Sequence, residues 1–289
     1  MKSISLNTLL VLVKHKVSVA VTFTAITGYL IYTGSFDFRI LFLVIGVYML
    51  AGGSSALNEF QERKYDALMP RTKDRPIPSG KMSSLQALIV SILFIITGSF
   101  VLYINFGIIP ASLGLFNVIW YNLIYTNLKR ITAFAVVPGS LVGAVPAFIG
   151  WTAAGGYLFE STIVFIAFFM FIWQIPHFWL LMLKYGKEYE AAGFPTINQS
   201  VSKVNLRIII FSWVIATSFS SLIIPLFLVN LSWLFFSAVF VLNILFVGVF
   251  TKLAFGDIAE INFKKSFISI NVYMLLFMVM LIIYHLYSI

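Results

Sequence analysis

Long apolar stretches alternate with short polar ones along almost the whole chain. Nine of these stretches are long and apolar enough to cross a hydrocarbon core of about 30 Å as helices of about 20 residues. They cover residues 15–34, 40–57, 85–104, 107–126, 134–152, 160–183, 207–229, 231–251 and 267–287. The pattern predicts an all-α integral membrane protein, a single domain over residues 1–289 built as a bundle of about nine transmembrane helices.

The gaps between these stretches are of two kinds. Four are short and nearly uncharged, and four are polar and basic; the first lie near 36–39, 105–106, 153–159 and Asn230, the second at 58–84, 127–133, 184–206 and 252–266. Of the 19 Lys and Arg residues, only Arg39 falls on the sparsely charged side. Because basic residues gather on the cytoplasmic side of membrane proteins, we expect a multi-pass protein of the cytoplasmic (inner) membrane. Its N-terminus and its basic gaps should face the cytoplasm.

Composition agrees with a protein whose partner is the lipid bilayer. Hydrophobic residues make up 61% of the 289 residues and charged residues 10%, against about 25% charged in soluble domains. The net charge of +9 reflects the orientation bias, so no nucleic-acid partner is predicted. The absence of cysteine excludes disulfides, thiolate nucleophiles and Cys-based metal sites. Lys14, His15 and Lys16 interrupt the apolar residues that follow the short polar segment 1–7, so no cleavable signal peptide is expected.

Acidic and amide side chains recur where the second apolar stretch ends. Asn58, Glu62 and Asp66 are four residues apart, so they share one face if the helix continues past Ala56. Two carboxylates and an amide oxygen are hard ligands of the kind that Mg²⁺ prefers, together with substrate phosphates. The alternative is a solvated helix end. A site is favoured because carboxylates at the end of an apolar span are costly unless partnered.

Basic residues follow this stripe in the loop that begins at Pro70. Arg71, Lys73 and Arg75 have the guanidinium and ammonium groups that bind the non-bridging oxygens of a diphosphate. The alternative is an ordinary basic loop of a membrane protein. Loops of about 58–84 and 184–206 are therefore the candidate active-site segments.

A second polar cluster follows the sixth apolar stretch. Lys184, Glu188 and Tyr189 lie there, and His177 precedes Lys184 by about two helical turns within the apolar segment. An imidazole at that depth is a satisfied packing residue, a proton carrier or a contact to a polar or metal-bearing ligand.

A third polar group closes the fourth apolar stretch. It comprises Tyr125, Lys129 and Arg130. The two basic residues are either a generic anchor on the basic side of the membrane or a third wall of an anion site.

Together these motifs resemble those of the intramembrane UbiA-type prenyltransferases, and within them the branch that farnesylates protohaem IX. The likeness runs from about residue 10 to the C-terminus. The matching segments are Asn58, Glu62 and Asp66 with Arg71-Thr72-Lys73-Asp74-Arg75-Pro76 and Gly80; Tyr125-Thr126 with Lys129-Arg130 and Thr132; Gly143-Ala144, Pro146 and Gly150-Trp151; and Trp173-Gln174-Ile175-Pro176-His177-Phe178-Trp179 with Lys184-Tyr185, Tyr189, Ala192-Gly193 and Pro195. The run 173–179 is the most specific of them.

The resemblance implies a reaction and its reactants. In this family the farnesyl group of farnesyl diphosphate passes to a vinyl group of haem b, with haem b a substrate and Mg²⁺ the cofactor. The metal ligands carried over are Asn58, Glu62, Asp66 and Glu188, with Arg71 and Arg75 beside them as catalytic residues. The substrate-binding residues carried over are Lys64, Lys73, Tyr125, Lys129, Arg130, His177, Lys184 and Tyr189. Haem A synthase or a terminal oxidase assembly is the implied protein partner.

Some positions depart from the family pattern. Glu62 replaces an aspartate and keeps its charge; Lys64 stands where a further acidic residue is common, and Lys187-Glu188 replace an aspartate pair. Lys64 would weaken metal binding or contact a phosphate. Two alternatives to haem farnesylation remain: prenylation of an aromatic acid for quinone synthesis, and transport without catalysis.

Overall fold

The computed structural model describes residues 4–199, 201–228, 232–256 and 262–287, and these residues form helices and connecting turns without any strand. The helices are α1 Leu6–Leu12, α2 His15–Thr33, α3 Arg39–Asp66, α4 Ser84–Phe106, α5 Ile108–Ile119, α6 Thr126–Leu128, α7 Val136–Gly139, α8 Leu141–Ala153, α9 Ser161–Ala191, α10 Lys203–Ile223, α11 Trp233–Phe255 and α12 Phe263–Tyr287. Short turns of other helical types are η1 Trp120–Tyr125, η2 Ala133–Ala135, η3 Ile197–Gln199 and η4 Ile224–Phe227.

The predicted all-α membrane fold is confirmed. Among the described residues, eight helical segments are long and apolar enough to span a membrane, and a ninth is counted if α1 and α2, bent by 59°, form one broken span. Every predicted apolar stretch corresponds to one of these segments. The main difference is at two ends, because α3 continues to Asp66 and α9 to Ala191. The predicted turn at Asn230 and residues 257–261 of the 252–266 gap lie outside the described residues.

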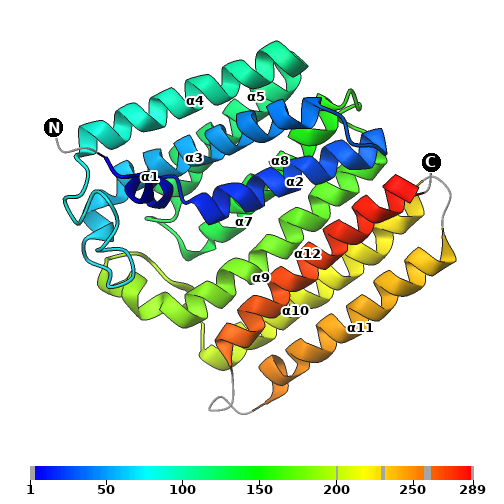
Figure 1. Cartoon of the computed structure of the whole chain (residues 1–289). Coiled ribbons are helices and arrows are strands. Elements are labelled where there is room, and N and C mark those ends of the chain that lie inside the picture. The colour runs from blue at the N-terminus through cyan, green and yellow to red at the C-terminus, as the bar shows by residue number, and fades with distance from the viewer. Residues whose placement is uncertain (1–3, 200, 229–231, 257–261, 288–289) are drawn as a thin grey trace.

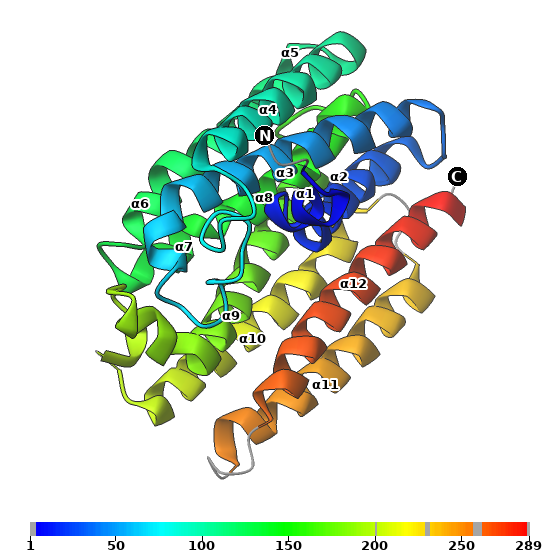
Figure 2. The ribbon, with the colours of Figure 1, turned by 60° about the vertical axis from the view of Figure 1, so that its left-hand side comes forward.

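The helices pack as one bundle with α4 and α11 at opposite edges (Figure 1). Helix α3 lies between α2 and α4, α2 packs on α8, and α9 contacts α8, α10 and α12. One apolar core contains residues of helices α8, α9, α10, α11 and α12, and a second contains residues of α2, α3, α4, α5 and α8. The loops after α3, α6 and α9 lie at one end of the bundle, whereas those after α2, α4 and α8 lie at the other, as Figures 1 and 2 show.

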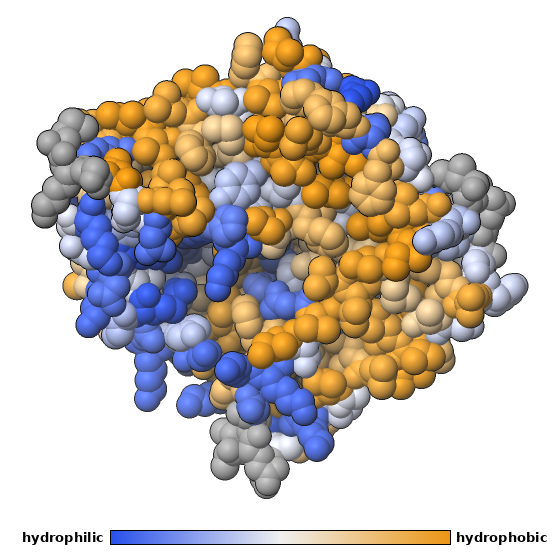
Figure 3. Space-filling view, viewed as in Figure 1, coloured by the Kyte–Doolittle hydropathy of each residue, from blue (hydrophilic) through white to orange (hydrophobic). Residues whose placement is uncertain are grey.

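Hydrophilic side chains gather at the end of the bundle where α3 and α9 end, while apolar side chains cover most of the remaining visible face (Figure 3). This separation agrees with the predicted division into basic and sparsely charged gaps. The cytoplasmic orientation of the polar end stays a prediction from the positive charges.

Two glycines bring helices α2 and α8 into backbone contact. A Cβ on Gly150 would overlap the carbonyl oxygen of Ala25, and a Cβ on Gly28 would overlap that of Ala147. Small residues permit this close packing of helices within membranes. The contact fixes α2, and with it the α1–α2 break that lies beside the polar end.

We predict that Gly150→Val destabilises the protein. The new side chain cannot fit without separating α2 from α8, at a cost of about 1–3 kcal/mol or more. The measurement is the thermal unfolding temperature in detergent. Gly248→Val is the matched control, because no atom lies within 4 Å of a Cβ added at Gly248. Equal unfolding temperatures for the two variants would contradict the packing analysis.

Candidate active site

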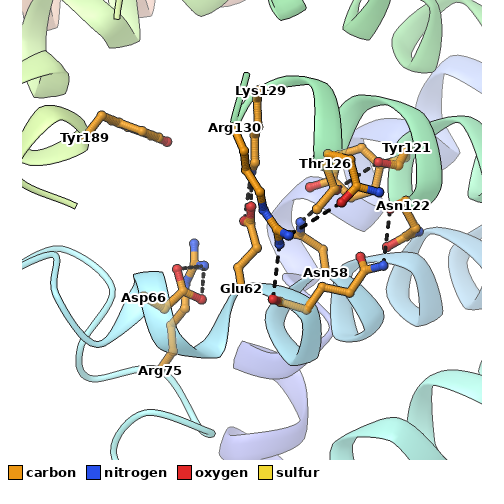
Figure 4. Close-up of polar contacts among 12 residues, drawn as sticks. Asn58, Glu62, Asp66, Arg75, Tyr121, Asn122, Thr126, Lys129, Arg130 and Tyr189 are labelled. Carbon is orange, nitrogen blue, oxygen red and sulfur yellow. Dashed lines mark hydrogen bonds and ion pairs between the residues drawn. The ribbon is translucent and has the colours of Figure 1, made fainter. Parts of the chain in front are cut away.

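The three predicted metal-ligand residues of the second span lie on one buried face of α3. Because α3 continues to Asp66, its last turns carry Asn58, Glu62 and Asp66 in a row. The side chains of Glu62 and Asp66 point toward Lys129 and Arg75 of neighbouring segments, as Figure 4 shows. Asn58 and Asp66 are 1% exposed and Glu62 is 5% exposed. We call these three residues the α3 stripe.

Both carboxylates of the α3 stripe are paired with basic side chains. Lys129 Nζ lies 2.7 and 2.8 Å from the two carboxylate oxygens of Glu62. Arg75 Nη1 donates to both carboxylate oxygens of Asp66 at 2.8 Å. Burial alone would lower the pKa of Arg75, but the neighbouring Asp66 outweighs it and leaves this pKa raised. The guanidinium therefore stays charged beside the stripe.

Asn58 also has a basic partner, which the sequence analysis missed. Lys14 Nζ donates to Asn58 Oδ1 at 3.0 Å. The amide nitrogen of Asn58 donates to the hydroxyl of Thr126 at 3.1 Å. The amide oxygen is thereby turned toward the same side as the carboxylates, where a cation would meet it.

The π-helical turn η1 lies in the fourth predicted span and positions the residues of that span that face the α3 stripe. The turn η1 widens the helix ahead of Thr126, whose hydroxyl donates to Tyr121 O at 2.8 Å. Asn122 in this turn donates to Ser54 Oγ at 2.6 Å and so ties it to α3. Such π-turns often occur at functional sites. Here the turn brings Lys129 to Glu62.

The loop after α3 is held over the stripe by two hydrogen bonds. Ile77 N donates to Glu59 Oε1 at 3.1 Å, and the Thr72 hydroxyl donates to Asp66 O at 2.9 Å. Glu59 is itself a buried carboxylate that the sequence analysis missed, and its Oε2 has no hydrogen-bond partner among the described residues. This loop carries Arg75 to Asp66.

The second polar cluster reaches the loop rather than the stripe. Arg71 N donates to Glu188 Oε2 at 3.3 Å, and Arg71 Nη2 donates to the hydroxyl of Tyr189 at 2.9 Å. Arg71 also lies over the rings of Tyr185 and Tyr189. The structure therefore links Glu188 to α3 through the loop.

The remaining predicted basic residues take different positions. Arg130 donates to Gln61 O at 3.2 Å and lies over the ring of Tyr65, beside the stripe. Lys64, Lys73 and Lys184 are exposed on the polar end and make no contact with the stripe in the described structure. Lys184 instead lies over its neighbouring tyrosine ring.

A pocket opens next to Lys129, between the segment 129–136 and α9. Its empty volume, which includes the open mouth, is about 510 Å³. Its wall is mostly apolar and aromatic; it comprises Tyr125, Lys129, Thr132, Ala133, Ala135, Val136, Phe178, Leu181, Met182, Tyr189, Phe194 and Pro195. The pocket thus has one cationic side chain, Lys129, in a mostly apolar wall.

His177 lies on α9 just behind this wall. Its ring contacts the rings of Trp173, Phe178 and Phe267, the last from α12. Its Nδ1 is buried and has no hydrogen-bond partner in the described part of the chain. A buried polar atom without a partner is uncommon, so this nitrogen is a candidate contact for a bound ligand.

The α3 stripe has the donor atoms that suit Mg²⁺. All are oxygens, and they comprise two carboxylates and one amide. In the described residues no three His, Cys, Asp or Glu side chains are grouped closely enough to hold a metal by themselves. Mg²⁺ fits such a partial set, because it is commonly bound through one or two carboxylates together with substrate phosphates.

Comparison with known proteins identifies relatives along most of the chain. Residues 21–271 match the model of the UbiA prenyltransferase family. The chain is 35% identical over 218 residues to the protohaem IX farnesyltransferase of Geobacter sulfurreducens, covering 75% of this chain and 80% of that protein. It is 36% identical over 214 residues to the one of Flavobacterium johnsoniae, covering 71% and 70%.

The fold also matches solved structures. A structure described as giving insights into digeranylgeranylglyceryl phosphate synthase has a TM-score of 0.77 at 16% identity, covering 97% of this chain and 98% of that one. A UbiA homologue from Archaeoglobus fulgidus bound to GPP and Mg²⁺ has a TM-score of 0.71 at 13% identity, covering 98% and 100%. At these identities the likeness concerns the fold.

Proposed function

The chain belongs to the UbiA prenyltransferase family, and from this premise we propose that it transfers the farnesyl group of farnesyl diphosphate to a vinyl group of haem b. The products are haem O and diphosphate. The observation that carries the proposal is the 35% identity, over three quarters of the chain, to a protohaem IX farnesyltransferase. The buried α3 stripe and its basic surroundings supply the chemistry.

The difficult step is the ionisation of an allylic diphosphate. The bond between farnesyl C1 and the diphosphate oxygen breaks, and the negative charge on the leaving group must be neutralised. Lys129, Arg75 and Arg130 would bind its oxygens from the side of α6 and the loop. Arg71 and Tyr189 would approach from the side of α9. Preorganised charges of this kind act in the transition state, where the leaving-group charge develops.

Asn58, Glu62 and Asp66 would hold Mg²⁺. Glu188, the fourth predicted ligand, accepts from Arg71 N in the described structure and would have to leave that contact to reach the metal. When bound, Mg²⁺ supplies Lewis-acid stabilisation of the departing diphosphate. Support for the cofactor comes from the donor set and from the family fold. Lys64 and Lys187 stand where the family pattern is acidic, so neither position offers a carboxylate to the metal.

The pocket beside Lys129 would hold the farnesyl chain. Tyr125, Phe178 and Phe194 give it an apolar, aromatic wall, which excludes water from the allylic cation. Faces of aromatic rings also stabilise a nearby cation. The new C–C bond then forms between farnesyl C1 and one vinyl carbon, which leaves the positive charge on the second vinyl carbon. Water adds to that carbon and gives the hydroxyl group, and one proton of the water is released to solvent.

His177 would be part of the haem site. Its position behind Phe178 places the imidazole next to the wall of the farnesyl pocket, and its unpartnered Nδ1 leaves a polar atom for iron or a propionate. We propose that the site faces the cytoplasm, and that haem A synthase or an oxidase assembly receives the product.

The first functional prediction is formation of haem O by the purified protein from haem b, farnesyl diphosphate and Mg²⁺. Mass analysis of the extracted haem should show the added hydroxyethylfarnesyl group, and chelation of Mg²⁺ should abolish it. Asp66→Ala should lower turnover by at least about 100-fold, since it removes a ligand of the metal that would stabilise the departing diphosphate. Asp74→Ala is the control, because Asp74 is an exposed carboxylate of the following loop.

Near-normal, Mg²⁺-dependent turnover of Asp66→Ala would show that the stripe is not the metal site. Prenylation of an aromatic acid in place of haem b would favour the quinone-synthesis alternative.

The second prediction is that His177→Ala weakens haem b binding by about 5–10-fold, the scale of one lost polar contact. A titration followed at the Soret band measures it, while the affinity for farnesyl diphosphate should not change. His285→Ala, in α12, is the histidine control. Equal losses of both affinities with a lower unfolding temperature would make His177 a packing residue.

A further inference from the structure

Each member of the α3 stripe is held by one basic side chain, and the three basic residues come from three separate segments. Lys14 lies at the break between α1 and α2, Arg75 in the loop after α3, and Lys129 directly after α6. Their partners are Asn58, Asp66 and Glu62 respectively. The three basic groups thus engage the same side-chain oxygens that would bind a divalent cation.

An unusual backbone conformation positions Lys14. With φ at 45°, it is the single non-glycine residue among those described that adopts a left-handed conformation. Helices α1 and α2 bend by 59° around it, and the preceding Leu12 and Val13 are buried. Left-handed backbone is unfavourable for residues with a side chain, so the surrounding packing maintains it. The result is an ammonium group directed at Asn58.

The charges around the α3 stripe disfavour binding of the divalent cation alone and of the diphosphate alone. Glu62 and Asp66 contribute two negative charges, which Lys129 and Arg75 balance, and the amine of Lys14 lies beside them on Asn58. A divalent cation alone would add two positive charges to this balanced group and would have to displace the existing partners. A diphosphate alone would meet two carboxylates that already engage the nearest basic groups.

We propose that the three basic side chains are exchangeable partners that change from the stripe to the diphosphate when metal and diphosphate bind together. The inference rests on the proposed function for the identity of the anion. Before binding, the ammonium and guanidinium groups neutralise the stripe; afterwards the stripe binds the metal and the same groups bind diphosphate oxygens. Both carboxylates are then paired in either state, with Arg75 and Lys129 before binding and with the metal afterwards. Metal and diphosphate must therefore bind with positive coupling, and thermodynamic linkage makes that coupling reciprocal.

Lys14 offers the sharpest test because its partner is a neutral amide. Its removal leaves no carboxylate unpaired, unlike removal of Arg75 or Lys129. If Lys14 is an exchangeable partner, Lys14→Met should affect the two ligands in opposite directions. The metal alone should bind more tightly because Asn58 Oδ1 is released, whereas diphosphate in the presence of metal should bind more weakly.

The experiment uses purified full-length protein and no haem or farnesyl group. Free Mn²⁺ is counted by electron paramagnetic resonance in the absence of diphosphate, and binding of radiolabelled inorganic diphosphate is then measured at saturating Mn²⁺. For Lys14→Met we expect about 10-fold tighter Mn²⁺ binding and about 10-fold weaker diphosphate binding, within the usual range of coupling between two ligands. Lys16→Met is the matched control, because Lys16 is an exposed lysine two residues away.

Lys14→Gly serves as a second variant that removes the ammonium and suits the left-handed backbone, so a folded protein without the amine can be tested. Unchanged Mn²⁺ affinity with weaker diphosphate binding would make Lys14 a fixed anion contact and would overturn the proposal. Weaker binding of both ligands would overturn it as well. Because the assay contains no haem, failure of wild-type protein to make haem O would refute the proposed function without deciding this result.

Discussion

Two carboxylates buried at the end of an apolar helix are the constraint on which the polar end of this protein depends. Glu62 and Asp66 cannot stay charged in the bundle without partners, and loss of one member of a buried ion pair typically costs about 3–5 kcal/mol. Three structural features supply those partners and the contact to Asn58. The loop over α3 brings Arg75, the π-helical turn η1 leads to Lys129, and the α1–α2 break presents Lys14.

Helix α9 lies beside both the proposed farnesyl pocket and the proposed haem site. Phe178 of α9 lines the pocket beside Lys129, while the adjacent His177 contacts Phe267 of α12. Prenyl donor and haem would thus meet at neighbouring positions of α9. The apolar bundle would keep solvent away from the allylic cation. The charge of the leaving diphosphate would be neutralised at the polar end.

Much of the fold follows from hydrophobic pattern, and part of the site does not. Apolar length alone located all the spans, and the four-residue spacing located the α3 stripe. Lys14 was missed because its partner is 44 residues away and no periodicity connects the two; locally it only interrupts an apolar stretch. The basic character of the loops did not distinguish Arg75, which binds Asp66, from Lys73, which is exposed. That difference depends on how the loop folds over α3.

The most direct test of the account is to locate the metal. A crystal structure with Mn²⁺ and inorganic diphosphate, with anomalous scattering to identify manganese, would place it relative to the stripe. The account predicts manganese within coordination distance of oxygens from Asn58, Glu62 and Asp66, with Lys129 and Arg75 turned from the carboxylates to the diphosphate. Manganese bound elsewhere, with the Glu62–Lys129 and Asp66–Arg75 pairs intact, would contradict it.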